Sequence, residues 1–216
     1  MDKDLKMWSY RIVHDLQFAP NPFKGVLTLA TCKPVIRKSH WSQPGVWIAG
    51  FAANSVTTGI KPKRGEERLI YLAKISRQLP LSKYWDKYPL KRAINCSEEF
   101  EEYSGDNIYS VDENGNFILQ NENHHDKGNY NQDVVKGKNV LICDEFYYFA
   151  PDSRLLIPSR FDELIHKTQG QKLMTNSSLI DEFISFVKDE TSNKIGIFGE
   201  IKRSELAKNT ECHSCC

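Results

Sequence analysis

The sequence predicts an α+β fold with a mixed or antiparallel sheet and one helix near its C-terminal end. Three observations support this prediction. Short runs typical of strands recur through most of the chain before residue 150, and few segments between them are long enough for a crossover helix. The last third instead carries an apolar pattern of helical spacing over residues 179–188. Such elements are typical of an α+β domain whose sheet curls toward a barrel.

The strands are predicted from alternation and from short apolar runs. Residues 7–13 alternate apolar and polar side chains, as a strand with one buried face does. The pair Asn114-Gly115 between two apolar runs is a strong signal for a hairpin turn. The predicted strands cover residues 7–13, 25–31, 46–51, 68–75, 107–111, 117–119, 140–143, 146–149 and 195–201.

Two helices are predicted between and after these strands. Residues 81–88 form a short helix, and residues 179–188 form a longer one that Ser178 caps. Residues 57–67 are rich in Gly, Pro and Lys and are expected to form a loop. The polar stretch 121–138 is expected to be mobile.

Composition indicates a globular protein with one domain over residues 7–201 and a polar tail over residues 202–216. The 29 basic and 28 acidic residues give a net charge of +1, so any contact with nucleic acid has to be local. The N-terminus lacks an apolar signal segment, and no run approaches the about 18 apolar residues of a membrane helix. We therefore expect a cytoplasmic protein with no membrane partner and with reduced cysteines.

The densest group of chemically active side chains lies near the N-terminus. His14 and Asp15 follow the first predicted strand and can act as a general base and its orienting partner. Alternatively, Asp15 caps a turn. Asn21 lies between two prolines that fix its backbone, so its amide can read the edge of a base or close an Asx turn.

Three further candidates follow the second predicted strand. Lys33 and Arg37 are cations near Cys32, and in this arrangement they would lower the pKa of the thiol and create a nucleophile. A buried cysteine that acts as a small apolar residue is the alternative. Lys33 and Arg37 can hold a phosphate, or they can be ordinary solvated cations.

Later segments add acidic, amide and aromatic candidates. Asp106 can serve as an acid, a base or a metal ligand and Asn107 can read a base, although both also fit an ordinary turn. Tyr109, Tyr147 and Tyr148 can stack on a base or pack in the core.

No metal or cofactor is expected. The His-His-Asp run at residues 124–126 places adjacent histidines on opposite faces of a strand, so only one of them could share a site with His14, and no further ligand cluster with metal spacing is present. The tail over residues 212–216 has one Cys-x-x-Cys and one histidine but lacks the second ligand pair of a zinc module.

Several separated motifs carry a family resemblance over residues 8–158. They are His14-Asp15-x-x-Phe18-Ala19-Pro20-Asn21-Pro22-Phe23, Thr28-Leu29-Ala30-x-Cys32-Lys33-Pro34, Ile36-Arg37, Gly105-Asp106-Asn107-Ile108-Tyr109 and Phe146-Tyr147-Tyr148-Phe149. Together they resemble the second family of nucleotide modification associated domains. The resemblance implies a link to pathways that modify DNA bases or nucleotides. The order of the first elements is also similar to the PUA and EVE pseudobarrels, which hold a nucleobase between strands and loops.

These observations lead to one expected function and two alternatives. We expect a protein that processes a nucleotide or nucleobase by metal-independent acid–base chemistry, as a transferase or hydrolase, in a DNA-modification or phage-defence pathway. The alternatives are a non-catalytic reader of a modified base or signalling nucleotide, and a scaffold that recruits modification enzymes. Expected partners are a nucleotide, nucleobase or nucleic acid, and modification or defence proteins. The expected catalytic residues are His14, Asp15, Cys32 and Asp106, and the expected nucleotide-binding residues are Asn21, Lys33, Arg37, Asn107, Tyr109, Tyr147 and Tyr148.

Overall fold

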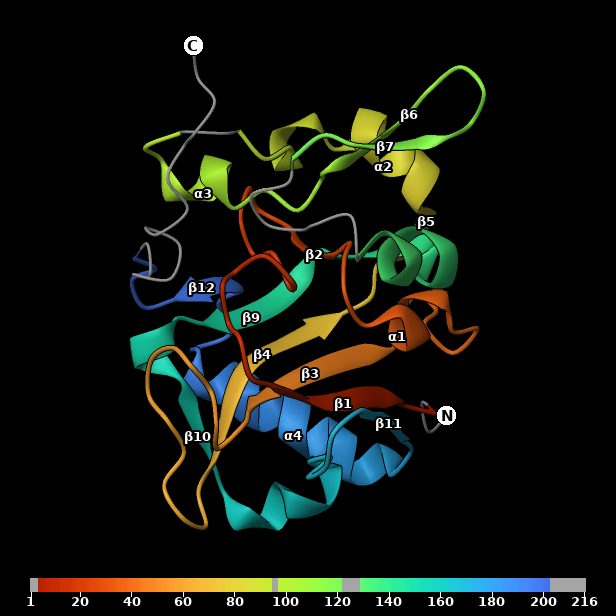
Figure 1. Cartoon of the computed structure of the whole chain (residues 1–216). Coiled ribbons are helices and arrows are strands. Elements are labelled where there is room, and N and C mark those ends of the chain that lie inside the picture. Colours follow the sequence, from red (N-terminus) through yellow and green to blue (C-terminus); the bar gives the residue numbers. More distant parts are fainter. Residues whose placement is uncertain (1–3, 95–96, 122–128, 203–216) are drawn as a thin grey trace. The chain divides into compact units, whose positions relative to one another are not determined.

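The computed structural model of the chain describes residues 4–94, 97–121 and 129–202 (Figure 1). It has two compact units. Of the described residues, the first unit comprises those within 4–15, 43–76 and 143–201, and the second unit comprises those within 16–42 and 77–142 together with residue 202. Both units combine strands and helices, so the α+β class is confirmed. The assignment of residues 7–201 to one domain stays a prediction.

A mixed, open sheet forms the centre of the first unit. Its strands follow the order β11-β1-β3-β4-β9-β12, and β10 pairs with β4. β1 and β3 are parallel, as are β9 and β12, whereas the other pairs are antiparallel. The edge strands β11 and β12 are not paired with each other, so the sheet is open. The comparison with closed pseudobarrels therefore remains an analogy. The strands are β1 (Met7–Ile12), β3 (Trp47–Ala52), β4 (Glu67–Lys74), β9 (Glu145–Phe149), β10 (Leu155–Ile157), β11 (Gln171–Met174) and β12 (Gly196–Phe198).

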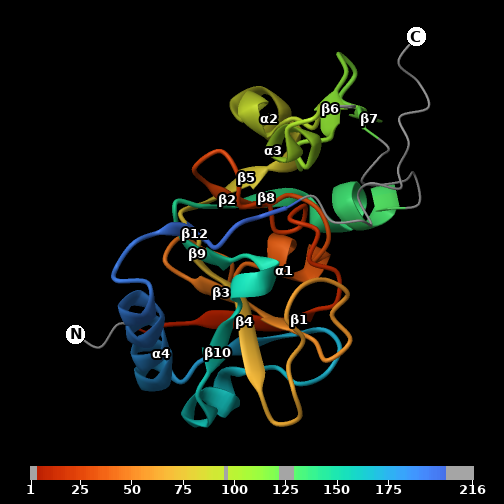
Figure 2. The ribbon, with the colours of Figure 1, turned by 90° about the vertical axis from the view of Figure 1, so that its left-hand side faces the viewer.

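The helix α4 (Ser177–Glu190) covers one side of this sheet, as Figure 2 shows. Its buried side chains recur at helical spacing and join the core of the sheet, so the predicted helix is confirmed. The predicted cap at Ser178 is wrong. Asn176 has non-helical dihedral angles, and its Oδ1 accepts a hydrogen bond from the Leu179 N–H at 3.3 Å. The buried residues of the helix are Ile180, Phe183, Ile184 and Val187.

The rest of the first unit consists of short turns and loops. The 3₁₀ turns η4 (Pro151–Ser153) and η5 (Ser159–Leu164) flank β10. The loop between β3 and β4 lies on the side of the sheet opposite α4 (Figure 2). Among the residues that the structure describes, no helix is long and apolar enough to cross a membrane.

The second unit contains smaller sheets and several short helices. One sheet has the order β2-β8-β5, and β6 and β7 form the predicted hairpin. The predicted helix at residues 81–88 is confirmed as α2. The elements are β2 (Leu27–Leu29), β5 (Arg77–Pro80), β6 (Tyr109–Val111), β7 (Phe117–Leu119), β8 (Asn139–Cys143), α1 (Pro34–Lys38), α2 (Leu81–Lys87), η1 (Pro89–Lys91), α3 (Phe100–Tyr103) and the π-helix η3 (Asn131–Gly137).

The polar stretch 121–138 differs from the expectation of mobility. Residues 122–128 lie outside the described residues, but η3 occupies much of the remainder, and its Asp133, Val134 and Gly137 are buried. Val134 contributes to the apolar core of the second unit. This segment is helical because one face of it is packed, although its overall composition is polar.

Candidate functional site

A buried ion pair between Arg37 and Asp133 organises the second unit. The Arg37 Nη1 lies 3.3 Å from the Asp133 Oδ1, and neither side chain is exposed. Three other contacts use the guanidinium: Nε donates to the carbonyl of Asn139 at 2.7 Å, Nη1 to that of Cys32 at 3.1 Å, and Nη2 to that of Asp133 at 2.9 Å. These hydrogen bonds offset the cost of burying the charges. Arg37 therefore binds protein groups and is buried away from any ligand in solution.

Gly137 and Tyr109 pack closely against this ion pair. A Cβ at Gly137 would lie 2.6 Å from the Arg37 Cζ, so only glycine leaves room for the guanidinium. The Asp133 Oδ2 accepts a hydrogen bond from the Tyr109 hydroxyl at 3.2 Å. The ion pair consequently joins α1, η3 and the hairpin strand β6.

Cys32 and Lys33, which we term the Cys-Lys corner, lie between β2 and α1. Both have left-handed backbones, with φ of 55° and 42°. This conformation costs a non-glycine residue about 1–2 kcal/mol. The ion pair holds the corner, because the Cys32 N–H donates to the Asp133 Oδ1 at 2.8 Å and the Cys32 carbonyl accepts from Arg37. Both side chains are half-buried, so a strained backbone presents a thiol and an amine at partly accessible positions.

Burial dominates the titration of this corner. It raises the pKa of the Cys32 thiol, and Asp133 raises that pKa further, while Lys33 and Arg37 oppose the shift. The two cations lower the thiol pKa, as expected, but burial and Asp133 outweigh them, so the predicted net lowering of the Cys32 pKa is wrong. Burial also lowers the pKa of the Lys33 ammonium. The corner thus favours a neutral thiol and brings the amine closer to its neutral form.

Asp106 lies in a second buried cluster of the second unit. Its Oδ1 accepts a hydrogen bond from the Tyr84 hydroxyl, and its Oδ2 accepts one from the Thr28 hydroxyl, each at 2.7 Å. Burial raises the pKa of this carboxyl, although Lys91 and the two hydroxyls act in the opposite direction. Asp106 is 1% exposed, so its oxygens serve groups inside the protein.

The amide of Asn21 is likewise enclosed. Its Nδ2 donates to the carbonyls of Gln17 at 3.1 Å and Ser104 at 2.7 Å. Its Oδ1 accepts from the Phe23 N–H at 3.3 Å and from the Lys91 ammonium at 2.7 Å. These contacts combine the expected Asx turn with a buried cation that sequence analysis did not identify.

The amide nitrogen of Asn107 also donates hydrogen bonds to backbone carbonyls. Its Nδ2 donates to the carbonyls of Tyr84, Trp85 and Tyr88. Its Oδ1 is buried and has no hydrogen-bond partner among the described residues. Asn107 therefore fixes the chain around α2 and retains one unused acceptor.

In the first unit, Asp15 forms a second buried ion pair. Its Oδ2 lies 3.1 Å from the Arg154 Nη2, with side-chain exposures of 1% and 0%, and its Oδ1 accepts a hydrogen bond from the Tyr148 hydroxyl. The neighbouring His14 is exposed, and its Nδ1 lies 3.3 Å from the Thr57 Oγ1. The described carboxylate contacts of Asp15 are thus with Arg154 and Tyr148, while the imidazole contacts a threonine.

The aromatic candidates lie in the cores of their units. Tyr109, Tyr147 and Tyr148 are at most 1% exposed. The Tyr147 hydroxyl donates to Glu145 at 3.3 Å, and burial together with that carboxylate raises its pKa to about 12. In this conformation the rings pack against protein rather than form a surface for stacking.

The structure groups the candidates around residues that the sequence did not mark. In the second unit, Cys32, Arg37 and Tyr109 contact Asp133, and Asn21 binds Lys91. In the first unit, Arg154 binds Asp15. No local signal identifies Asp133, because its partner lies 96 residues away in the sequence.

Within residues 4–94, 97–121 and 129–202, no group of three or more His, Cys, Asp or Glu side chains is arranged to hold a metal ion. The run at residues 124–126 and the Cys-containing tail lie outside the described residues.

Comparison with known proteins gives one match. The family model described as nucleotide modification associated domain 2 matches residues 4–204, which include parts of both units. No curated protein and no solved structure matches the chain.

Proposed function

Because the chain belongs to the nucleotide modification associated domain 2 family, we propose that it binds a nucleotide or nucleobase at the Cys-Lys corner and processes it by acid–base chemistry. Membership associates the protein with nucleotide modification, and the corner supplies the chemistry. The observation that supports this site is the pair of adjacent left-handed residues, Cys32 and Lys33, held by a fully buried ion pair. Backbone strain of this kind is typical of positions where a protein fixes functional side chains.

Each residue of the corner has a distinct role in this proposal. The Lys33 amine, with a pKa lowered by burial, holds a phosphate oxygen when protonated and takes up a proton from the substrate when neutral. The Cys32 thiol, kept neutral by a raised pKa, donates a hydrogen bond to the bound base or sugar. Arg37, Asp133 and Tyr109 are positioning residues, because their polar groups contact the corner or one another. No metal or cofactor is used.

The other candidates take supporting roles. Asp106, Asn21 and Asn107 are buried and bound to protein groups, so they shape the second unit. Asp15 fixes Arg154 and Tyr148 in the first unit. Tyr147 is a core residue of the same unit. His14, which is exposed, remains a candidate general base at the surface of the first unit.

A non-catalytic reader of a modified base or signalling nucleotide is the second candidate function. One observation favours it: the Cys32 thiol has a raised pKa and is therefore a weak nucleophile. In either case we place the protein in a cytoplasmic DNA-modification or phage-defence pathway, with modification or defence proteins as partners.

Lys33 variants of the purified full chain separate these functions. Canonical and base-modified deoxynucleoside 5′-monophosphates are titrated by calorimetry, and products are followed by mass spectrometry. Processing at the corner predicts that Lys33→Met abolishes turnover and that Lys33→Arg retains affinity without turnover. A reader predicts loss of affinity in Lys33→Met and no turnover in any form. Absence of binding by the wild-type protein would refute both functions.

A histidine variant tests the remaining candidate base. If His14 is the base, His14→Asn abolishes turnover and leaves the dissociation constant nearly unchanged. If the chemistry takes place at the Cys-Lys corner alone, His14→Asn leaves turnover at the wild-type rate. Lys38→Asn, which changes an exposed cation of the second unit, serves as the control for non-specific effects.

A further inference from the structure

A loop of the first unit presents three cations on a fixed base. We term residues 57–66, between β3 and β4, the basic loop. The Ile60 N–H donates to the carbonyl of Pro151 at 2.8 Å, and the Ile60 carbonyl accepts from the Arg154 Nη1 at 2.9 Å. Gly59 lies so close to Pro151 that a Cβ would be 2.2 Å from the Pro151 carbonyl oxygen. The start of the basic loop is therefore fixed by packing and by an arginine that is itself ion-paired.

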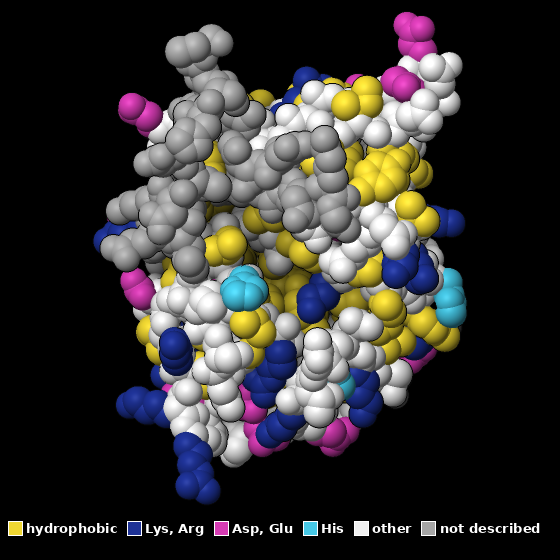
Figure 3. All heavy atoms as spheres, viewed as in Figure 1, with side chains coloured by type: hydrophobic (Ala, Val, Ile, Leu, Met, Phe, Trp, Pro, Cys, Tyr) yellow, Lys and Arg dark blue, Asp and Glu magenta, His cyan; other side chains and the backbone are white. Residues whose placement is uncertain are grey.

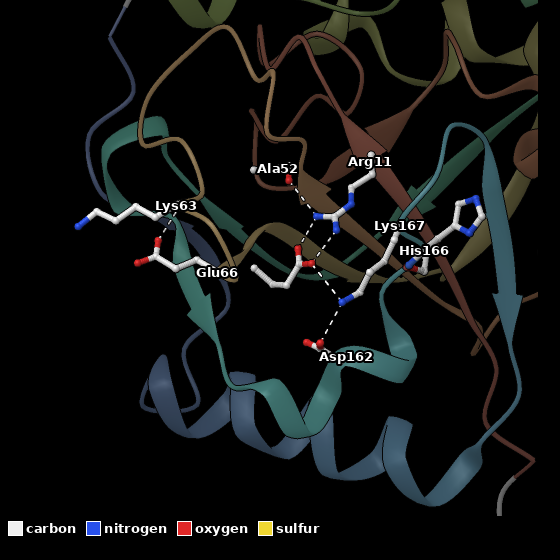
Figure 4. A network of polar contacts seen from close by, with 9 residues as sticks. Arg11, Ala52, Lys63, Glu66, Asp162, His166 and Lys167 are labelled. Carbon is white, nitrogen blue, oxygen red and sulfur yellow. Dashed lines mark hydrogen bonds and ion pairs between the residues drawn. The ribbon is translucent and has the colours of Figure 1, made fainter.

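The acidic residue of the basic loop, Glu66, forms its ion pair with Arg68, outside the loop. Lys61, Lys63 and Arg64 are exposed, and none of them has a carboxylate within 4.0 Å among the described residues. The Glu66 carboxylate instead accepts hydrogen bonds from the backbone N–H of Lys63 and from the Arg68 Nη2, both at 3.1 Å. Figure 4 shows the Lys63 side chain pointing away from that carboxylate.

The next acidic residue along the chain is also occupied. The Glu67 Oε1 accepts from the Arg11 Nη2 at 2.8 Å and lies 3.6 Å from the Lys167 ammonium, which in turn donates to Asp162 at 2.9 Å (Figure 4). This network of two cations and two carboxylates balances its own charge. It therefore offers no carboxylate within ion-pair distance to the described side chains of Lys61, Lys63 and Arg64.

The position and composition of the basic loop suit a polyanion. Figure 3 views the first unit from the side opposite α4, and Lys and Arg side chains are frequent on the lower part of that face, where Figure 1 shows the basic loop. Residues 61–65 are Lys, Pro, Lys, Arg and Gly, so the tip carries no large apolar side chain for insertion into a bilayer. Because the net charge of the chain is only +1, attraction of a polyanion has to arise from such a local group.

We propose that the basic loop binds the phosphate backbone of a nucleic acid through Lys61, Lys63 and Arg64. The inference goes beyond the proposed function, because it concerns a polynucleotide bound by the first unit. It uses residues of the other unit, so the two proposals can fail separately. His14 contacts Thr57 at the start of the basic loop, so this imidazole belongs to the same unit as the three cations.

Oligonucleotide binding by the full chain tests the proposal. Fluorescein-labelled DNA of mixed sequence, single-stranded and duplex, is titrated by anisotropy at several salt concentrations. The triple variant Lys61→Ser, Lys63→Ser, Arg64→Ser should bind at least about tenfold more weakly at low salt, and the slope of log affinity against log salt should fall by about 2–3, since each phosphate contact contributes about 0.7–0.9. The control Lys83→Ser, Lys87→Ser, Lys136→Ser removes the same charge from exposed positions of the second unit and should change neither quantity.

Three outcomes would overturn the proposal. In the first, the loop variant binds DNA as tightly as the wild-type protein. In the second, the control variant loses as much affinity as the loop variant, so that net charge alone explains binding. In the third, the wild-type protein binds phosphatidylserine vesicles through these residues and does not bind DNA. Thermal unfolding checks that both variants fold, since exposed substitutions change stability by only about 0.5 kcal/mol.

Failure of the Cys-Lys corner and failure of the basic loop would give different experimental results. If only the Cys-Lys corner fails, mononucleotides do not bind, while salt-dependent binding of DNA persists and is lost in the loop variant. If only the basic loop fails, mononucleotides bind at the corner, and the loop variant retains the wild-type affinity for DNA.

Discussion

Replacement of Arg37 by methionine should severely destabilise the second unit. Methionine retains much of the apolar stem but removes the guanidinium from a site with no exposure. The Asp133 carboxylate then stays buried with the hydroxyl of Tyr109 and the N–H of Cys32 as its described donors. The carbonyls of Cys32 and Asn139 also lose hydrogen bonds from the guanidinium.

The magnitude follows from the burial of the pair. Removing one partner of a buried ion pair costs about 3–5 kcal/mol, because the other charge is left uncompensated. A partly exposed pair of the same unit gives the matched control: Lys24 lies 3.2 Å from Glu101, with side-chain exposures of 27% and 52%. Lys24→Met should therefore cost about 0–1 kcal/mol. Arg37→Lys should fall between the two, since it retains the charge and loses the forked geometry.

Urea unfolding followed by tryptophan fluorescence and circular dichroism measures these differences. Hydrogen exchange of the backbone amides of α1 and η3 checks that the loss arises in the second unit. The reasoning is refuted if Arg37→Met loses no more free energy of unfolding than Lys24→Met. A full loss in Arg37→Lys would show that geometry rather than charge dominates the interaction.

Three further predictions concern other buried groups of the second unit. Lys91→Met should lower the free energy of unfolding by about 3 kcal/mol, because its ammonium donates to the Asn21 carbonyl, the Asn21 Oδ1 and the Val26 carbonyl, and each buried group left without its partner costs about 1–3 kcal/mol. A loss below about 1 kcal/mol in urea unfolding would contradict this prediction. Gly105→Ala should cost about 1–3 kcal/mol, since its Cβ would lie 2.5 Å from the carbonyl oxygen of Lys91, and an unchanged melting temperature would argue against that close approach. Burial raises the folded-state pKa of Asp106 above its usual 3.8, so its contribution to stability is complete below that value and is lost as pH rises through the folded-state pKa. Asp106→Asn should remove this part of the pH dependence, and parallel stability profiles for the two proteins between acid and neutral pH would exclude it.

The sequence determined the local elements of this protein and the family to which it belongs. The β6–β7 hairpin follows from Asn114-Gly115, and α4 follows from apolar spacing within a few turns. Each of these signals lies in a short window, where backbone preference and side-chain period act directly. The order of separated motifs was also sufficient to indicate the family that the comparison then showed.

Only the tertiary structure decided which side chains meet. Arg37 forms an ion pair with Asp133, which is 96 residues away in the sequence, and Asp15 forms one with Arg154, which is 139 residues away. The shift of the Cys32 pKa also depended on the fold, because burial and Asp133 outweigh the cations that are near in sequence. A sequence specifies the type of each group, but the field that acts on a group is set by the charges and the solvent access that folding brings to it.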